Sequence, residues 1–513
     1  MSASKNKELD STSSNKQNEE EILLLHPPIT LKKKDLPTFG FYPPLGLGYV
    51  ASVLLKEGYP VGIVDCLVEG KDTVEDEENG MVRVGLSKKE IESILARKKP
   101  KIVGIAGTFS SFSNDGIRLA RIVRESLPKA FIVVGGAGTT EVKQLLATDV
   151  IDVLINGEAE YIFRDVVDSI SKGDMEAAYK IKGTSWKVAE KIVTNPSREV
   201  TRDLDNIPFP AYHLLPMKKY LWQKHANFAA AMRWPIAHMI TSRGCIYNCI
   251  FCSTTKYFAK FRARSVENVL EEMKLLMTTY GIREFHFHDD FFMSDVKRVR
   301  HLCEKIIEEK MDIRWQVSQG VNSVQLDEDL LELMYNSGMY RVGFPIDSGC
   351  PEMLKYMRKP INLDKVKRLI KKCNELGLYV FGNFVIGFPE ETKEQIEQTT
   401  QFIMASGLDY AKISILQPHP GTDIYGVFER LGLLPEGLKH GSTYFHTEYN
   451  TVHLRAEELN AIRVEALKRC GRHRLRRMLS PSGMKKYIFP KFRSMESAVY
   501  FMRMGFEVLK GNV

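Results

Sequence analysis

Short apolar runs alternate with helical patterns over residues 21–175. The runs lie at 22–25, 61–65, 101–107, 131–136 and 151–157. Between them, stretches such as 45–57 and 114–127 place apolar residues at helical spacing. Buried strands that alternate with helices are typical of an open parallel sheet. We therefore predict an α/β, doubly wound, Rossmann-like domain at 21–175, with any ligand beyond the carboxyl ends of its strands.

A second series of strands and amphipathic helices occupies residues 235–430. The predicted strands are 237–244, 284–290, 313–319, 340–347, 379–388 and 410–420. The predicted helices are 266–280, 295–310, 327–337, 363–376 and 393–406. Six such units predict a partial (β/α)6 barrel with its site at the carboxyl ends of the strands. The remaining segments are a predicted linker at 176–234, a helical basic C-terminal region at 431–513 and a disordered polar tail at 1–20.

Charge and composition indicate where the protein is located and where its basic residues lie, but not what its site does. No apolar run approaches the roughly 18 residues that span a bilayer, and the N-terminus lacks the apolar core of a signal peptide, so we expect a cytoplasmic protein. The net charge is +8. Between Lys468 and Arg503, eleven Lys or Arg face one acid, Glu496, so the basicity belongs to the C-terminal region.

Three of the eight cysteines fall within one short window, TSRGCIYNCIFC. Cys245, Cys249 and Cys252 follow the first predicted barrel strand with the spacing C-x3-C-x2-C. In a reducing compartment such thiols bind metal more often than they pair. Three thiolates are one too few for a closed zinc site, but they leave one iron of a [4Fe–4S] cube open to an exogenous ligand.

This spacing, with Phe251 before the last cysteine on the first strand of a six-unit barrel, resembles the radical SAM superfamily. The resemblance implies a [4Fe–4S] cluster on the three cysteines, whose open iron binds S-adenosylmethionine (SAM). It places Asp289 or Asp290 at the SAM amino group, although one of them could instead cap the next helix. It also places Asp347 at the ribose or amino group. Gly387, in GNFVIGFPEET, falls in the region that lines the adenine pocket.

The first domain then resembles the cobalamin-binding domain of cobalamin-dependent radical SAM enzymes. The matching features are LHPP, PPLGLGYVAS, DCLVEG, a serine cluster, a glycine pair and NGEAEYIF. They place the following residues near cobalamin: Asp65, Gly70, Ser110, Ser111, Gly135, Gly136 and Gly157. Leu67 stands where related domains carry a cobalt-ligating histidine, so no protein ligand to cobalt is expected from that position.

The family resemblance leaves more than one activity open. The leading hypothesis is a methyltransferase that acts on an unactivated carbon through a 5′-deoxyadenosyl radical and methylcobalamin. An oxidative cyclase or rearrangement enzyme of the anaerobic tetrapyrrole type is the alternative, and a non-enzymatic cobalamin sensor or carrier is a third. A methylthiotransferase is excluded, because its additional N-terminal cysteines are missing and Cys66 is alone in the first domain. No catalytic side chain is assigned.

The C-terminal basic region bears on partners and substrate. Its apolar residues lie at near-helical spacing, which fits helices that cover the barrel. The alternative interpretation is a basic amphipathic surface that contacts anionic lipid at the inner face of the membrane. We expect a small-molecule or lipid substrate and a flavodoxin or ferredoxin-type electron donor. No base-reading module is visible, so no nucleic-acid partner is expected.

Overall fold

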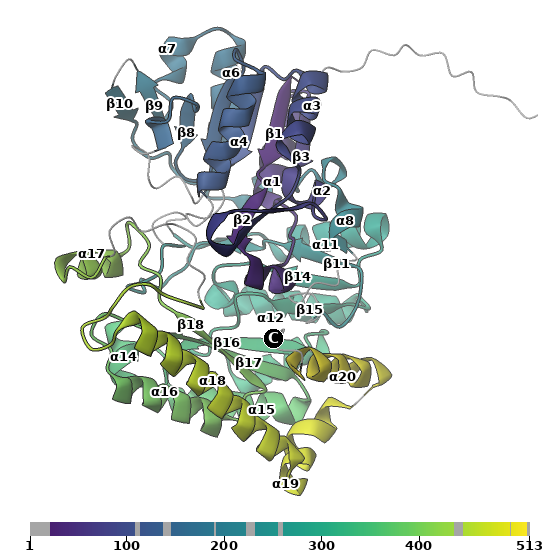
Figure 1. Cartoon of the computed structure of the whole chain (residues 1–513). Coiled ribbons are helices and arrows are strands. Elements are labelled where there is room, and N and C mark those ends of the chain that lie inside the picture. Colours follow the sequence, from purple (N-terminus) through teal and green to yellow (C-terminus); the bar gives the residue numbers. More distant parts are fainter. Residues whose placement is uncertain are drawn as a thin grey trace, which may run out of the picture.

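The computed structural model describes residues 21–107, 113–136, 145–188, 191–221, 231–254, 260–434, 445–492 and 494–509. The first domain is built on a seven-stranded sheet in the order β10-β9-β8-β7-β6-β1-β3 (Figure 1). Its parallel strands are β1 (Ile22–His26), β3 (Val61–Asp65), β6 (Ile102–Ala106), β7 (Phe131–Gly135) and β8 (Val153–Ile155). These strands confirm the doubly wound prediction.

Helices pack on both faces of this sheet because its strands are apolar on both sides. Residues of β1 alternate between two separate cores, with Leu23 and Leu25 in one and Ile22 and Leu24 in the other. The covering helices are α1 (Leu45–Lys56), α3 (Lys88–Lys98), α4 (Ser113–Ser126) and α6 (Ala159–Ser171). Ser87 caps α3 through a capping box with Glu90.

The first sheet continues beyond residue 175, where the linker was expected to begin. The antiparallel strands β9 (Thr184–Val188) and β10 (Lys191–Thr194) extend its edge. A second small sheet, β2-β5-β4, was also not predicted. It consists of β2 (Ile29–Lys32), β4 (Val74–Asp76) and β5 (Met81–Val84), and 3-10 helix η1 (Lys33–Thr38) follows β2. Short α2 (Cys66–Glu69), α7 (Met175–Ala178) and α8 (Met217–Leu221) complete this part of the chain.

The second domain forms the predicted barrel from two parallel sheets, β11-β14-β15 and β16-β17-β18. Their strands are β11 (Ile236–Met239), β14 (Glu284–Phe287), β15 (Arg314–Val317), β16 (Arg341–Asp347), β17 (Tyr379–Ile386) and β18 (Tyr410–Ile415). The helices between them are α11 (Val266–Tyr280), α12 (Val296–Glu308), α13 (Glu328–Asn336), α14 (Pro351–Tyr356), α15 (Leu363–Leu376) and α16 (Lys393–Ser406), and α17 (Asp423–Arg430) follows β18.

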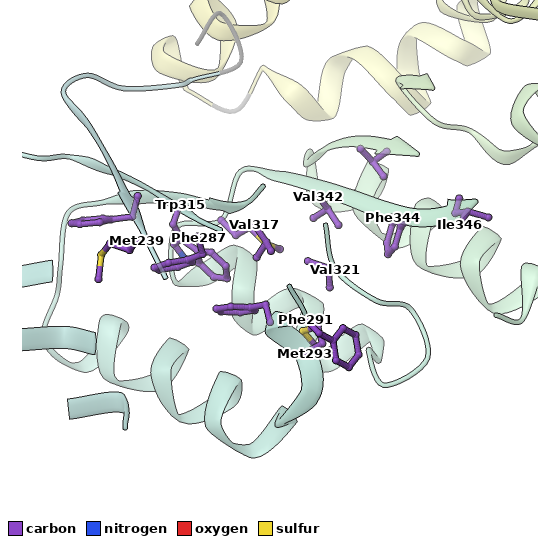
Figure 2. Packing of buried hydrophobic residues seen from close by; sticks show 14 of the residues in the cluster. Met239, Phe287, Phe291, Met293, Trp315, Val317, Val321, Val342, Phe344 and Ile346 are labelled. Atoms are coloured by element: carbon purple, nitrogen blue, oxygen red, sulfur yellow. The ribbon is translucent and has the colours of Figure 1, made fainter. Parts of the chain in front are cut away.

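A single apolar core joins the two sheets of the barrel. Trp315 of β15 is fully buried and forms an isolated bridge to Met339, while Val321 N–H donates to Gly343 of β16. Figure 2 shows Trp315 beside Phe287, with Val342 of the other sheet in the same cluster. Polar residues alternate with apolar ones along β14 and β15, so the polar side chains of these strands lie on the face opposite this core.

The C-terminal region packs against the barrel, as one of its two interpretations expected. Helix α18 (Ala456–Leu479) lies along α16 and β18 (Figure 1). Helix α20 (Met495–Leu509) brings Tyr500 into a buried cluster with Tyr340 and Tyr379. Lys491, between these helices, forms a buried ion pair with Asp409. None of the helices in the described part of the chain is long and apolar enough to cross a membrane.

Candidate functional site

The three cysteines lie where β11 leads into a loop, at the carboxyl end of the barrel. All three are half-buried. The Sγ of Cys245 accepts from Tyr247 N–H at 3.5 Å, and Cys252 Sγ lies 3.4 Å from the Thr254 hydroxyl. Burial raises the pKa of the Cys249 thiol to about 12 and also raises that of Cys245. Bound iron supplies the positive charge that deprotonates such thiols.

The donor set fits an iron–sulfur cube better than a single ion. Within the described residues, no three His, Cys, Asp or Glu side chains converge as ligands of one metal ion. A [4Fe–4S] cluster takes each thiolate on a different iron, so its ligands do not need to meet at one point. Three thiols on one loop, with no fourth cysteine beside them among the described residues, match such a cluster with one open iron.

The two aspartates after β14 have different surroundings. Asp289 is fully buried, and its carboxylate accepts from Thr241 N–H at 2.7 Å, from the Thr241 hydroxyl and from the Ser242 hydroxyl at 2.6 Å. Asp290 accepts from Gly244 N–H at 3.0 Å, directly before the cysteine loop. Neither residue caps a helix in this structure, because Asp295 caps α12. Asp289 therefore braces the start of the loop, and Asp290 lies closer to the cysteines.

Asp347 ends β16 in a left-handed conformation, with φ of 65°. Its buried carboxylate pairs with Lys359, whose ammonium group also donates to Pro345 O at 3.0 Å. The Lys359 charge acts on Cys249 as well, in the direction that lowers the pKa of the thiol. Lys359 thus neutralises Asp347 and places positive charge beside the cysteine loop, a role that sequence reasoning missed.

Gly387 follows β17 in a conformation that favours glycine, with φ of 88°. Its N–H donates to Glu391 at 2.6 Å, and its carbonyl accepts from Tyr449 at 3.1 Å. Burial raises the pKa of Glu391 to about 8. A side chain at position 387 would meet Leu459 of α18, so the turn is fixed from both sides.

The predicted cobalamin rim lies at the carboxyl end of the first sheet. Asp65 is buried there, and its carboxylate is held by His26, Tyr220 and the N–H groups of Leu67 and Val68. It therefore shapes the loop through protein contacts. The Leu67 side chain is itself buried in the core that the barrel shares.

The rim glycines differ in how tightly they are packed. A Cβ on Gly70 would lie 2.2 Å from Leu86 N, and one on Gly136 would lie 2.2 Å from Gly107 O. A Cβ on Gly135 would lie 3.3 Å from Ile155 Cβ, which is tighter than an ordinary contact, whereas Gly157 has φ of 106° and open space around it. Backbone without side chains at the sheet edge fits the close approach of a large cofactor. Ser110 and Ser111 lie outside the described residues.

Buried ion pairs join the cysteine loop to the first domain. Arg243 immediately precedes Gly244 and Cys245, and its guanidinium donates to Glu160 at 2.6 Å. It also lies 3.5 Å from Glu158, which Arg262 contacts at 3.0 Å. Both glutamates belong to the NGEAEY segment, which contains Gly157. The segment was recognised from the sequence as part of the cobalamin rim, but its contact with the cysteine loop was not.

A histidine cluster occupies the inner face of the first barrel sheet. His238 Nδ1 lies 2.7 Å from His288 Nε2, and His286 is bound by Glu284 at 2.6 Å. Burial lowers the pKa of His288 to about 3, so its ring is neutral at ordinary pH. Tyr42 of the first domain packs its ring against both His238 and His288. The alternation of His286 and His288 along a strand was a usable signal for a polar inner face.

Two family models match the two domains. The B12 binding domain matches residues 38–167, and the radical SAM superfamily matches residues 239–403. An uncharacterised methyltransferase of Pyrococcus horikoshii is 35% identical over 79% of this chain and 82% of its own length. Cytidylyl-2-hydroxyethylphosphonate methyltransferase of Streptomyces wedmorensis is 32% identical over 83% of this chain and 85% of its length. More distant relatives include an anaerobic magnesium-protoporphyrin IX monomethyl ester cyclase of Rubrivivax gelatinosus, at 25% identity over 80% of this chain and 70% of its length.

The fold is also shared with a solved structure. The radical S-adenosylmethionine methyltransferase TsrM from Kitasatospora setae aligns with a TM-score of 0.69 at 17% identity, over 96% of this chain and 98% of its own. The family matches confirm the expected enzyme and its cofactors: a [4Fe–4S] cluster and SAM in the barrel, and cobalamin in the first domain. The chain therefore belongs to the radical SAM superfamily, in the group whose barrel follows a B12-binding domain.

Proposed function

We propose that this enzyme is a cobalamin-dependent radical SAM methyltransferase that methylates an unactivated carbon of a small molecule. The observation that carries the proposal is the similarity, over more than 80% of their own lengths, to two relatives that are both named methyltransferases. When bound, the cluster and SAM supply a 5′-deoxyadenosyl radical, and cobalamin supplies the methyl group. The protein contributes binding, orientation and exclusion of water.

The residues around the cysteine loop can be given roles on this basis. Cys245, Cys249 and Cys252 would hold the cluster, and Asp289 keeps their loop in place through Thr241. Asp290 is the better candidate for the SAM amino group, since the carboxylate of Asp289 is already satisfied by three donors.

Two further groups would act on the same ligand. Asp347 would contact SAM while it remains paired with Lys359, because an unpaired carboxylate is costly to bury. The turn at Gly387 offers its backbone edge to an adenine, and Glu391 holds that turn in shape from behind.

The first domain would bind cobalamin above its rim glycines. Gly135, Gly136 and Gly157 leave the strand ends bare, and the loop from Asp65 to Gly70 is shaped by the buried Asp65 carboxylate. The buried Leu67 cannot ligate cobalt. Spectra of the bound Co(II) form should therefore lack nitrogen coupling from a protein imidazole, and such coupling would overturn this assignment.

Product analysis separates methyl transfer from the alternative, oxidative cyclisation, which the cyclase relatives favour. With SAM labelled in its methyl group, methylation places the label in the product, whereas cyclisation leaves the product unlabelled. A comparison of metabolites and lipids from cells with and without the gene should reveal a product that differs by one methylene. If the protein were a cobalamin carrier without catalysis, no product would carry the label, and cells with and without the gene would not differ by a methylated product.

Reduction of the cluster would require an electron donor, and we propose a flavodoxin or ferredoxin-type protein for this role. The acidic surfaces of such donors suit a basic partner, and the net charge here is +8. A donor that reduces the cluster faster at low salt than at high salt would support this pairing. A rate independent of salt would contradict it.

We also propose that the C-terminal region contacts an anionic membrane surface. Several of its apolar side chains are exposed: Leu475, Leu479, Met484, Phe489, Phe492, Met495, Val499 and Met502. Exposed basic residues lie among them: Arg472, Arg476, Lys485 and Lys486. Other basic residues of the region are bound within the fold, as in the pairs Arg469–Glu397 and Lys491–Asp409. Apolar side chains beside basic charge are complementary to anionic lipid.

Flotation with vesicles tests the membrane proposal. The protein should float with anionic vesicles at low salt, and Leu479→Ser combined with Met495→Ser should reduce the bound fraction. Val193→Ser, which changes an exposed apolar residue of the first domain, is the matched control. Failure to float with anionic vesicles, or equal loss in the control, would refute the contact, and a soluble substrate would then be favoured.

A further inference from the structure

The inner face of the second barrel sheet carries an unusual lysine. Lys412 of β18 pairs in register with Asn383 of β17, and Ser414 follows on the same face. The opposite face of these strands is apolar, with Phe384 packed against Phe402 of α16. Lys412, Asn383 and Ser414 therefore point away from the covering helices, toward the interior of the barrel.

The side chain of Lys412 is accessible to solvent, but its ammonium group is partly surrounded by protein. Solvent reaches its side chain, yet the surrounding protein lowers the pKa of its ammonium group. The positive charges of Arg341 and Arg463 act in the same direction. Within the part of the chain that the structure describes, no carboxylate pairs with Lys412. Its ammonium group instead lies 5.5 Å from the centre of the Phe445 ring.

The two arginines extend this positive cluster. Arg463 of α18 lies over the same Phe445 ring at 4.9 Å and donates to Ile413 O at 2.7 Å. Arg341, at the start of β16, stacks on Phe381 at 4.4 Å and donates to the Tyr410 hydroxyl. Among the described residues, neither guanidinium forms an ion pair with a carboxylate.

The first domain adds charge next to this cluster. His446, which follows Phe445, has its pKa lowered by burial and by Lys32 and Lys34 of the first domain. Lys412 and Arg463 at Phe445, with two lysines of the first domain beside His446, thus gather positive charge around one short segment, and Arg341 of β16 acts on Lys412. Gathering like charges without counterions is unfavourable, and a fold that needed only packing could use neutral side chains instead.

We propose that Lys412, Arg463 and Arg341 bind an oxyanion of the substrate, such as a phosphate, phosphonate or carboxylate group. The inference rests on the proposed function, because it takes the inner face of the barrel as the substrate site. Lys412 and Arg463 would contact the anion, and Phe445 would hold their charged groups at the required spacing. Arg341 lies deeper and adds to the positive potential. Asn383 and Ser414 could donate neutral hydrogen bonds to the same group.

Binding of inorganic pyrophosphate tests the site without knowledge of the substrate. The anaerobic holoenzyme, with cluster, hydroxocobalamin and SAM, is reductively methylated with 13C on its lysines. The Lys412 signal is assigned as the one that is missing from Lys412→Arg. It should titrate at lower pH than the other lysine signals and shift in a saturable manner with pyrophosphate. Sodium chloride at equal ionic strength should not cause this shift.

Variants supply the second readout, the affinity for pyrophosphate measured by calorimetry. Lys412→Met or Arg463→Gln should weaken binding by about tenfold or more, as expected for the loss of one charge-assisted contact. Lys367→Met is the matched control, because Lys367 also lies over an aromatic ring, Phe402, at 5.6 Å, but on the outer helix α15. It should leave the affinity unchanged.

The outcomes distinguish this inference from the proposed function. Wild-type protein must first cleave SAM under reducing conditions, and failure there would count against the radical SAM function itself. If SAM is cleaved but the Lys412 signal does not respond to pyrophosphate, the oxyanion site is refuted alone. Equal affinities in wild type, Lys412→Met and Arg463→Gln would also refute it, since the anion would then bind elsewhere.

Discussion

Replacement of Arg243 by Met tests whether the cysteine loop and the cobalamin rim are held as one unit. The change removes a buried guanidinium that contacts Glu160 at 2.6 Å and Glu158 at 3.5 Å, while Arg262 keeps its contact with Glu158. Breaking a buried ion pair costs about 3–5 kcal/mol. Because Arg262 still compensates Glu158, we expect the lower end of this range.

Hydrogen exchange measures this loss locally, which is preferable to a global unfolding experiment on a chain of several domains. About 3 kcal/mol corresponds to roughly a hundredfold loss of protection, in both the cysteine loop and the 156–163 segment. Adding Glu160→Gln should restore part of the protection, since it removes the uncompensated charge. Arg164→Met is the control, because Arg164 pairs with Asp165 on the same helix α6 and with Glu57 at the end of α1, both within the first domain. Unchanged protection of the cysteine loop in folded Arg243→Met would refute the coupling.

Three further predictions follow from buried groups around the site. Lys359→Met leaves Asp347 unpaired and should lower the thermal stability of the apo protein by about 3 kcal/mol or more. Lys359→Met with Asp347→Asn should recover much of this loss, and no recovery would contradict the pairing.

Glu391 has a folded pKa of about 8 against 4.5 when unfolded, so its neutral form stabilises the fold at low pH. This advantage is lost as the pH rises from about 5 to 8, by up to about 1.4 kcal/mol per unit, so Glu391→Gln should gain on wild type over that range in melting experiments. A pH-independent difference would contradict this. Gly136→Ala should lower the free energy of unfolding by about 2–4 kcal/mol. The new Cβ would meet Gly107 O, and the alanine backbone would be strained at this positive φ. Gly157→Ala introduces the backbone strain without the clash, so its loss of stability should be smaller. Equal losses in the two variants would argue against the close packing of Gly136 on Gly107.

Elements with regularly spaced apolar residues, and residues within a known motif, could be predicted from the sequence. The helix at 363–376 and the strands that lead into Cys245 and Asp347 were found because burial of one face fixes their apolar spacing. Strands β9 and β10 were missed, since antiparallel strands of five and four residues carry little periodic signal.

The site was predictable where a motif names its residues, but not where distant segments meet. Lys359 and Arg243 gain their importance from partners, Asp347 and Glu160, that no local pattern connects to them. Lys412 looked like an ordinary strand residue, and only the three-dimensional arrangement of the described residues shows that none of their carboxylates pairs with it. Likewise, the sequence could not decide between Asp289 and Asp290. The hydrogen bonds of Asp289 are the reason why we propose Asp290 for the SAM contact.

Reductive cleavage of SAM by the reconstituted protein tests the central claim most directly. Anaerobically reconstituted wild-type protein should hold about four irons and four sulfides per chain and convert SAM to 5′-deoxyadenosine. Triple substitution of Cys245, Cys249 and Cys252 by Ala should abolish both, while cobalamin bound to the first domain is retained. Cys303→Ala, at a buried thiol of α12, serves as the control and should keep the cluster. Cleavage of SAM by the triple variant would contradict the account.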